Sequence, residues 1–366
     1  MNKTARLWRN FDFILFGTVV VLIIYGVLMI RSATLGAVDT DLISRVPRQI
    51  QYAIIGIVTM FVFAAIDYRL LAALQPYIYG ILVFLLALVA VLGQVGDAGA
   101  QRWLAVGLPV QPSELAKVLI VIVLGQHLQK QYPKMDKLRT VLISLGYVGL
   151  PAVLIFLQPS LGITILIMFI WFVMTWAAGL RLKHIALLSF AAVLGFPVLW
   201  ANMQEYQRAR IINFITCEDT RDPACYNIFQ ARISIGSGGL LGKGYASGTQ
   251  SRLRFLRVRH TDFIFSVIGE ELGFVGASLV FVLIGIVLWR IMRAAARARD
   301  ALGALICYGI AAIIFFQTVV STGMNLNVLP VTGLTLPFIS SGGSSLLTLL
   351  IGIGIVQSVV MRSERA

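Results

Sequence analysis

The chain has 366 residues, of which 58% are hydrophobic and 13% are charged, and its mean hydropathy is +0.88. This balance lies far outside that of soluble proteins and predicts an integral membrane protein. A net charge of +14 could suggest nucleic-acid binding. In a membrane protein, however, Lys and Arg gather on the cytoplasmic side against anionic lipid, and this accounts for the cytoplasmic part of the excess. No nucleic-acid binding is therefore predicted.

Ten apolar runs are long enough for helices that cross a bilayer, which takes about 20 residues each. They cover residues 11–30, 50–66, 77–94, 113–129, 139–157, 160–179, 184–200, 263–289, 302–323 and 344–361. The sequence therefore predicts an all-α, polytopic membrane protein with ten transmembrane helices, built as a single integral membrane domain over residues 1–366.

The distribution of Lys and Arg predicts how these helices are oriented. With the N-terminus inside, sixteen basic residues fall in the inner segments, whereas the short outer connections carry only Arg31, Arg45, Arg48 and Arg102. Both termini are therefore expected in the cytoplasm. The connection at about 201–262, between helices 7 and 8, becomes one long extracytoplasmic loop, and its nine basic residues favour an anionic partner outside.

Three features stand out within this outer loop. Residues 207–215, "QRARIINFI", are typical of an amphipathic helix at the membrane interface, with a solvated loop as an equal alternative. Cys217 and Cys225 lie in an oxidising compartment, so that a disulfide between them and two free thiols both stay open. Residues 234–250 are rich in glycine but lack the spacing of a nucleotide phosphate loop. They predict a flexible turn-rich segment or a backbone that approaches a diphosphate or sugar closely.

A second glycine-rich stretch, "LPVTGLTLPFISSGGSSLL", occupies residues 329–347 in the last outer connection. Pro330, Pro337 and the Gly342–Gly343 pair exclude a continuous helix there. We expect irregular backbone that dips back towards the membrane, where protein or a wet cavity satisfies its polar groups.

Charged side chains near the outer ends of the apolar runs need a partner or a function, because each costs about 2.5–3.5 kcal/mol inside a membrane. Glu114 and Lys117 lie three residues apart on one helical face, so the two could neutralise each other or line an outward cavity. Arg48 and Arg102 could be interfacial anchors, or could form with Lys117 a clamp for phosphate oxygens.

Asp262 lies directly before an apolar run, where an ionised group is costly. It could cap the helix that follows. The same carboxylate, half desolvated at the mouth of a cavity, could also be a general base. Glu270 and Glu271 lie about two turns deeper and each demands a polar neighbour. No His, Cys or carboxylate spacing marks a zinc site, so no structural metal is predicted.

At these residues the chain resembles the shape, elongation, division and sporulation (SEDS) family of peptidoglycan glycosyltransferases. The matching motifs are "GAQRWL" (99–104), "QPSELAK" (111–117), "QPSLG" (158–162), "ISIGSGGLLGKGY" (233–245), "GTQ" (248–250), "RHTDFIFSVIGEELGFVG" (259–276) and "LPVTGLTLPFISSGGSSL" (329–346). They cover most of the chain in the family order.

The resemblance implies that the substrate is lipid II, a disaccharide pentapeptide carried on undecaprenyl diphosphate, and that Asp262 is catalytic. Asp262 is then the general base that takes the proton from the acceptor GlcNAc 4-hydroxyl, and undecaprenyl diphosphate leaves. The expected substrate-binding residues are Arg48, Arg102, Gln111, Glu114, Lys117, Gln158, Ser160, His260 and Thr261. No cofactor is required by this chemistry, although Mg²⁺ or Mn²⁺ could bridge the diphosphate oxygens.

The resemblance also implies a multi-pass protein of the bacterial inner membrane that pairs with a class B penicillin-binding protein, a transpeptidase. The segment 254–265 favours the RodA-like elongation type, whereas residues 332–346 lie closer to the FtsW-like division type. Two other functions stay open. A flippase for lipid II would need a site near the midplane, and a scaffold for wall-synthesis partners would need no catalytic group.

Overall fold

The computed structural model of the protein describes residues 8–35, 40–92, 94–95, 101–103, 111–158, 160–216, 223–253, 255–256 and 258–363. Its helices are α2 (Phe13–Thr34), α3 (Thr40–Ile43), α4 (Arg45–Ala65), α5 (Tyr68–Ala73), α6 (Gln75–Leu92), α7 (Pro112–Gln131), the 3-10 helix η1 (Tyr132–Lys134), α8 (Leu138–Leu157), α9 (Leu161–Ala177), α10 (Leu182–Asn202), α11 (Glu205–Thr216), α12 (Pro223–Gly238), α13 (Thr249–Arg252), α14 (Ile264–Ala296), α15 (Ala301–Asn325) and α16 (Gly343–Met361). The predicted all-α class is confirmed.

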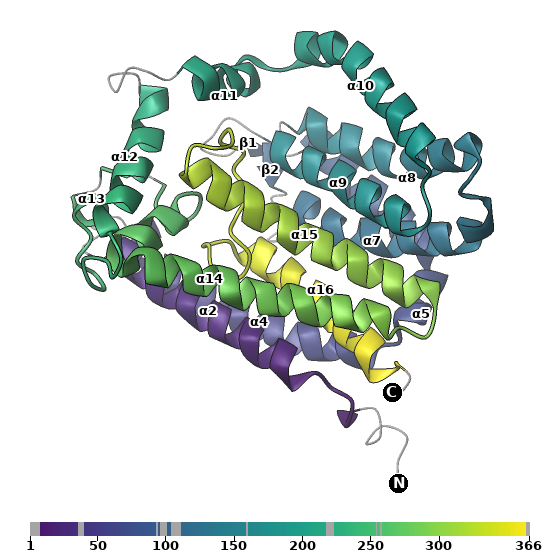
Figure 1. The fold of residues 1–366 in the computed structure, drawn as a ribbon, viewed down its shortest axis with the longest axis horizontal. Coiled ribbons are helices and arrows are strands. Elements are labelled where there is room, and N and C mark those ends of the chain that lie inside the picture. The colour runs from purple at the N-terminus through teal and green to yellow at the C-terminus, as the bar shows by residue number, and fades with distance from the viewer. Residues whose placement is uncertain are drawn as a thin grey trace.

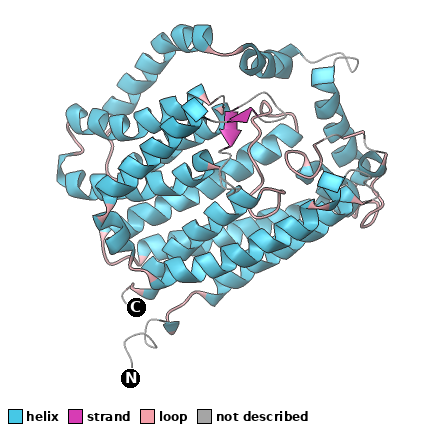
Figure 2. Ribbon diagram, turned by 180° about the vertical axis from the view of Figure 1, so that it is seen from behind, coloured by secondary structure: helices cyan, strands magenta, loops and turns pink. Residues whose placement is uncertain are grey.

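Two short strands are the one addition to this class within the described residues. β1 (Gln94–Val95) and β2 (Gln101–Trp103) pair antiparallel, with Gln94 opposite Trp103. Figure 2 shows this small sheet at the end of the bundle opposite the C-terminus. It was not expected, because strands of two and three residues leave no alternating pattern in the sequence.

Each of the ten predicted apolar runs coincides with a helix. Seven of these helices, α2, α4, α8, α10, α14, α15 and α16, are long and apolar enough to cross a membrane, and α6 and α9 contain shorter apolar segments. The twenty residues of α7 include the Glu114 and Lys117 that lower its hydropathy. α14 runs beyond its predicted end at residue 289 to Ala296.

The core of the bundle surrounds α16. In the apolar window of α16, 89% of the residues are buried, against 6% in α10, so α16 is central and α10 peripheral. Figure 1 shows α10 extending away from the bundle, while α16 runs through it beside α15. At Gly354 a Cβ atom would lie 2.5 Å from the carbonyl oxygen of Met60, so glycine permits the close contact of α16 with α4.

The first and last long helices meet at one end of the molecule. The Asp12 carboxylate caps α2 by accepting a bond from Leu15 N, and it pairs with Arg290 at 2.7 Å. Gln357, near the end of α16, clasps the backbone of Asp12: its Oε1 accepts from Asp12 N (3.0 Å) and its Nε2 donates to Asp12 O (2.9 Å). We call this end of the bundle the α2/α16 end.

The long connection after α10 is more helical than the sequence suggested. α11 confirms a helix at 207–215, and α12 covers the start of the glycine-rich stretch that was expected to be irregular. These two helices arch from the end of α10 towards the start of α14 (Figure 1). Cys225 is disulfide-bonded, which confirms the first of the two alternatives for this thiol, and Cys307 is free and buried. Cys217, the partner considered for Cys225, lies outside the described residues.

Candidate functional site

A cavity of about 120 Å³ opens at the end of the bundle opposite the α2/α16 end, where α7 and α9 begin. One wall comes from the two helix starts, and the other from the irregular segment between α15 and α16 together with the first turn of α16. Three residues predicted to bind substrate line it together: Gln111, Glu114 and Ser160. The opposite wall consists of Thr332, Gly333, Leu334, Thr335, Gly342, Gly343, Ser344 and Ser345.

The segment 326–342 is irregular between α15 and α16, as predicted, and we call it the re-entrant loop. Several of its polar groups are bonded to the surrounding protein, whereas the buried Thr332 Oγ1 has no hydrogen-bond partner among the described residues. Gln111 N donates to Ser344 Oγ at 3.0 Å, just beyond the loop, and Gly342 N donates to Gln49 Oε1 at 3.3 Å. The loop lies so close to α9 that a Cβ atom at Gly162 would be 2.9 Å from Thr332 O. The loop is therefore a packed part of the structure.

Glu114 and Lys117 form an ion pair on the first turns of α7. Lys117 Nζ lies 2.5 Å from Glu114 Oε2, the lysine has no exposed surface, and Glu114 retains about 8%. Glu114 lines the cavity and Lys117 does not, so the buried ammonium group is neutralised by the carboxylate and does not itself face the cavity. The predicted pairing is confirmed, whereas the predicted contact with a diphosphate stays a prediction.

Of the two arginine side chains of the predicted clamp, the structure describes that of Arg48. Arg48 is exposed and pairs with Asp41 at 3.2 Å, as Arg45 also does. Arg48 is not among the residues that line the cavity. Arg102 lies in β2, and its side chain falls outside the described part of the chain. The clamp therefore stays a prediction.

Gln158, expected to bind substrate, holds two helices together. Its side chain is 2% exposed, and its Nε2 donates to Leu86 O of α6 at 2.8 Å. Gln158 is the C-cap residue of α8, so this bond ties the end of α8 to α6 inside the bundle. Its partner lies 72 residues away, so sequence spacing carried no sign of this contact.

The backbone of residues 260–262 is held through its three carbonyl groups, each of which accepts a hydrogen bond. His260 O accepts from Ser341 N (3.0 Å), Thr261 O accepts from Ser340 Oγ (2.8 Å), and Asp262 O accepts from Asn325 Nδ2 (2.8 Å). The donors come from the re-entrant loop and from the end of α15. The main chain of the predicted catalytic segment is thus fixed against the same loop that forms a wall of the Glu114 cavity.

Asp262 does not occupy the capping position that the sequence allowed. α14 begins at Ile264, its N-cap residue is Phe263, and no side chain caps it from that position. Asp262 lies one residue earlier and is partly buried. Its neighbour His260 is also partly buried, and burial followed by the charges of Arg45 and Arg259 lowers the pKa of His260 to about 4. The imidazole is therefore neutral at neutral pH.

Glu270 and Glu271 find the polar neighbours that the sequence demanded, in the glycine-rich segment 238–250. Glu270 Oε1 accepts from Lys243 Nζ (2.9 Å), Thr249 Oγ1 (3.1 Å) and Gln250 N (2.9 Å). Glu271 accepts from Ala246 N (3.1 Å) and from Ser32 Oγ of α2 (2.6 and 2.7 Å). Both carboxylates are fully buried. The glycine-rich segment is thus anchored by two acids.

The same segment completes a break in α14. Gly273 has φ 63° and ψ −160°, which interrupts the helix. In an unbroken helix Glu270 O and Glu271 O would accept from residues 274 and 275. Here they accept from Lys243 N (3.0 Å) and Gly244 N (2.9 Å), while Phe274 N and Val275 N donate to Gly239 O (2.9 Å) and Leu240 O (3.1 Å). All four groups of these two helical bonds therefore find partners in residues 239–244.

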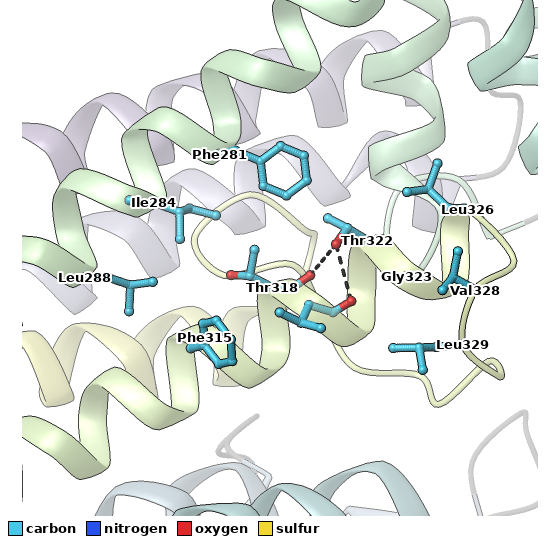
Figure 3. Close-up of a pocket in the computed structure, with 12 residues that line it drawn as sticks. Phe281, Ile284, Leu288, Phe315, Thr318, Thr322, Gly323, Leu326, Val328 and Leu329 are labelled. Carbon is cyan, nitrogen blue, oxygen red and sulfur yellow. Dashed lines mark hydrogen bonds between the residues drawn. The ribbon is translucent and has the colours of Figure 1, made fainter. Parts of the chain in front are cut away.

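A second hollow lies between α14 and α15 and is lined almost entirely by carbon. Its volume is about 330 Å³, and Figure 3 shows Phe281, Ile284 and Leu288 of α14 facing Phe315 of α15 across it. The hydroxyls of Thr318 and Thr322 donate to carbonyl groups of their own helix. The hollow therefore presents an apolar surface without a polar group free to orient a ligand. In the described residues no cluster of three His, Cys, Asp or Glu side chains could hold a metal ion.

These features define a polytopic helical membrane protein with a polar cavity at one end of the bundle, lined by Glu114 and by the re-entrant loop. The same loop bonds to the backbone of His260 and Thr261. The side chains of residues 260–262 are not among those that line the cavity. The family model of the FtsW, RodA and SpoVE cell cycle proteins matches residues 12–365. The chain belongs to this family.

Several relatives match nearly the whole chain. Peptidoglycan glycosyltransferase MrdB of Escherichia coli K12 is 38% identical over 342 residues, which are 92% of this chain and 90% of that protein. Stage V sporulation protein E of Bacillus subtilis is 32% identical, covering 95% of this chain and 96% of that protein. The probable peptidoglycan glycosyltransferase FtsW of Trichlorobacter lovleyi is 34% identical, with 98% and 95% covered.

Solved structures share the fold. A chain from a study of how a peptidoglycan synthase complex coordinates polymerization and crosslinking superposes with a TM-score of 0.82 at 32% identity, covering 96% of this chain and 97% of that one. The crystal structure of the rod shape determining protein RodA from Thermus thermophilus gives a TM-score of 0.72 at 30% identity, covering 97% and 98%.

Proposed function

We propose that the protein is a peptidoglycan glycosyltransferase of the elongation type that polymerises lipid II into glycan strands in the bacterial inner membrane. Family membership and the names of the relatives at 38% and 34% identity support this activity. The structural observation that carries it is the re-entrant loop. The loop forms a wall of the cavity beside Glu114 and also bonds to the carbonyls of His260 and Thr261, next to Asp262.

In the proposed reaction the Asp262 carboxylate accepts the proton of the acceptor GlcNAc 4-hydroxyl. The hydroxyl oxygen forms a bond to the anomeric carbon of the donor MurNAc, whose bond to the diphosphate oxygen breaks. Undecaprenyl diphosphate leaves with the electron pair, and the anomeric centre is inverted. Because the leaving group already carries its charge, cations are more useful to it than an acid. Lys117, Arg102 and Arg48 are proposed to supply them.

The remaining predicted residues are proposed to bind lipid II around this centre. Gln111, Glu114 and Ser160 line the cavity, and His260 and Thr261 flank the base. Gln158 is proposed to act by tying the end of α8 to α6, shortly before Ser160 in the chain. The proposed steps use these side chains, and a divalent cation that bridges diphosphate oxygens would have to take its other ligands from substrate and water.

We infer further that α2, α4, α6, α7, α8, α9, α10, α14, α15 and α16 all cross the membrane, with both termini in the cytoplasm. The even number of helices agrees with the meeting of α2 and α16 at one end, through Asp12 and Gln357. The lower hydropathy of α7 is offset because its charges are paired and its face is buried between neighbouring helices. The 201–262 connection then lies outside the cell membrane.

We also propose a class B penicillin-binding protein as the partner of this chain. The solved structural relative comes from a complex that couples polymerization to crosslinking, and a transpeptidase is the enzyme class that crosslinks peptidoglycan. The apolar hollow between α14 and α15 is the surface we assign to a membrane helix of that partner, because it faces outward and is almost entirely apolar.

The test of the catalytic proposal is polymerisation of purified lipid II by the purified protein in detergent, without an ion gradient. Asp262→Asn removes the base without changing its size, and the rate should fall by about 100-fold or more. Glu205→Gln, an exposed acid on α11, is the control and should keep the rate of the parent. Near-normal polymerisation by folded Asp262→Asn would remove Asp262 from its role, and lipid translocation without any polymer would favour a flippase.

A further inference from the structure

Asn325, the last residue of α15, has a side-chain amide whose hydrogen-bonding capacity is fully used. The side chain is completely buried. Its Nδ2 donates to Asp262 O (2.8 Å) and to Ser321 O (2.7 Å), and its Oδ1 accepts from Ser266 N (3.0 Å) and Ser266 Oγ (2.6 Å). Two donors and two acceptor positions are all that a carboxamide offers. These partners therefore fix both the position and the orientation of the amide.

Two of the partners are four residues apart in the segment that leads into α14. Had α14 begun earlier, Asp262 O would accept the helical bond from Ser266 N. The Asn325 amide lies between these two groups and bonds to both. Asp262 is thereby kept outside the first helical turn, and its main chain is tied to the end of α15.

The other two carbonyls of the segment are held by the re-entrant loop, which begins directly after Asn325. Ser340 and Ser341 of that loop bond to Thr261 O and His260 O. Asn325 thus adds a hydrogen bond from a transmembrane helix to the carbonyl group of Asp262. The loop contributes the hydrogen bonds to the carbonyl groups of His260 and Thr261. A shift of the amide would move the residue whose carboxylate the proposed reaction uses.

We propose that Asn325 is a positioning residue for Asp262, one that sets the backbone from which the carboxylate reaches the acceptor hydroxyl. This inference rests on the proposed catalytic role of Asp262. Asn325 touches no reacting atom, so its loss should slow the chemical step more than it weakens substrate binding.

The chain offers a matched control at its opposite end. Gln357 is also a fully buried carboxamide, and it also bonds to the backbone of an aspartate, Asp12. Asn325→Leu and Gln357→Leu remove the same chemical group from equally buried positions. A role in general stability would make the two variants alike.

The experiment compares kcat and KM for lipid II polymerisation and the melting temperature of both variants. Asn325→Leu should lower kcat by about 10- to 100-fold, as expected for a misplaced catalytic group, and should leave KM within about threefold. Gln357→Leu should keep kcat within about twofold at a temperature where it is folded. Asn325→Asp has the size of the native residue but lacks the donor to Asp262 O. It should behave like Asn325→Leu, and it replaces that variant should the leucine variant not fold.

A second measurement does not depend on catalysis. In an Asp262→Cys background the rate of thiol alkylation reports the position of residue 262, since Cys225 is disulfide-bonded and Cys307 is buried. Adding Asn325→Asp should change this rate by about threefold or more, because access controls thiol reactivity. Adding Gln357→Leu should leave it unchanged.

The outcomes separate the two proposals. Unchanged alkylation, together with an equal loss of stability and normal kcat in both leucine variants, would overturn the positioning role. Should Asp262→Asn polymerise normally while Asn325→Asp still alters alkylation, the catalytic proposal falls, and the structural tie between Asn325 and residue 262 stands.

Discussion

Individual charges inside this bundle are tolerated because each meets a defined partner. Lys117 is the clearest case, since it has no exposed surface and ends 2.5 Å from Glu114. Removing one partner of a buried pair costs about 3–5 kcal/mol, whereas replacing both by apolar groups can be neutral. A double replacement can therefore restore stability, and any loss of activity that remains shows that the pair also binds substrate.

The pair can be tested with single and double variants. Lys117→Met alone should destabilise the protein by about 3–5 kcal/mol because Glu114 is left buried and unpaired. Glu114→Gln combined with Lys117→Met should recover most of that stability in thermal unfolding. If the pair serves substrate, the double variant should still polymerise lipid II at least about tenfold more slowly, which is the loss of one charge interaction.

Recovery of both stability and polymerisation in the double variant would show that the pair serves folding alone. The sequence could predict the pair itself, because a spacing of three residues on a helix puts two side chains on one face. It could not predict the contacts of Gln158 or Asn325. Their partners, Leu86 and Asp262, lie on other elements, and which backbone group an amide meets depends on tertiary packing.

At the scale of single elements, α14 departs most from the prediction. An apolar run from 263 to 289 predicts one continuous helix, yet the structure breaks it at Gly273 and fills the break with residues 239–244 of the connection between α10 and α14. Part of this arrangement could be predicted from the sequence. Two adjacent glutamates in an apolar run demanded polar neighbours, and a glycine-rich segment offered them, but nothing in the sequence linked the two.

Substitution of Gly273 tests how much the break contributes to stability. An alanine Cβ atom would lie 2.4 Å from Gly242 N and 2.6 Å from Leu240 O, and φ is +63° there. Gly273→Ala should therefore cost at least about 1–3 kcal/mol from backbone strain alone. The apparent melting temperature in detergent should fall, and polymerisation should fall with it.

Gly146 of α8 is the matched control. It is exposed within a helix, and a Cβ atom there would meet nothing within 4 Å. Gly146→Ala should be neutral or stabilising by up to about 1 kcal/mol. Equal melting temperatures for Gly273→Ala and Gly146→Ala would mean that the outer connection does not hold the break.

For the whole molecule, the positions of the ten apolar helices could be predicted well because hydrophobic runs of this length leave few alternatives. Their arrangement could not be predicted. A helix that is apolar on every side carries no periodicity to choose its neighbours, and α10 and α16 illustrate the two extremes with 6% and 89% of their windows buried. α12 was missed because the glycines at its end resemble a loop.

The proposed partner surface can be tested on the whole molecule. Gly285 lies in the hollow between α14 and α15, and a Cβ atom there would meet nothing within 4 Å. Gly285→Leu should fill the hollow without disturbing the fold, and should reduce co-purification of the class B penicillin-binding protein by about tenfold or more, as for a blocked interface anchor.

Gly146→Leu places the same side chain at another exposed glycine, on α8, and should leave co-purification unchanged. Both variants should melt near the temperature of the parent. Loss of the partner in both variants would point to a general membrane effect, and retention in both would assign the partner to a different surface.

The re-entrant loop contacts two parts of the molecule at once. Residues near its end border the cavity beside Glu114, and others donate hydrogen bonds to the carbonyl groups of His260 and Thr261. Such a shared support cannot yield on one side alone without breaking bonds on the other. A bulky lipid-linked sugar that pushed the cavity wide would strain the very peptides next to the carboxylate. Binding of the donor sugar would then be coupled directly to the position of Asp262, the proposed base.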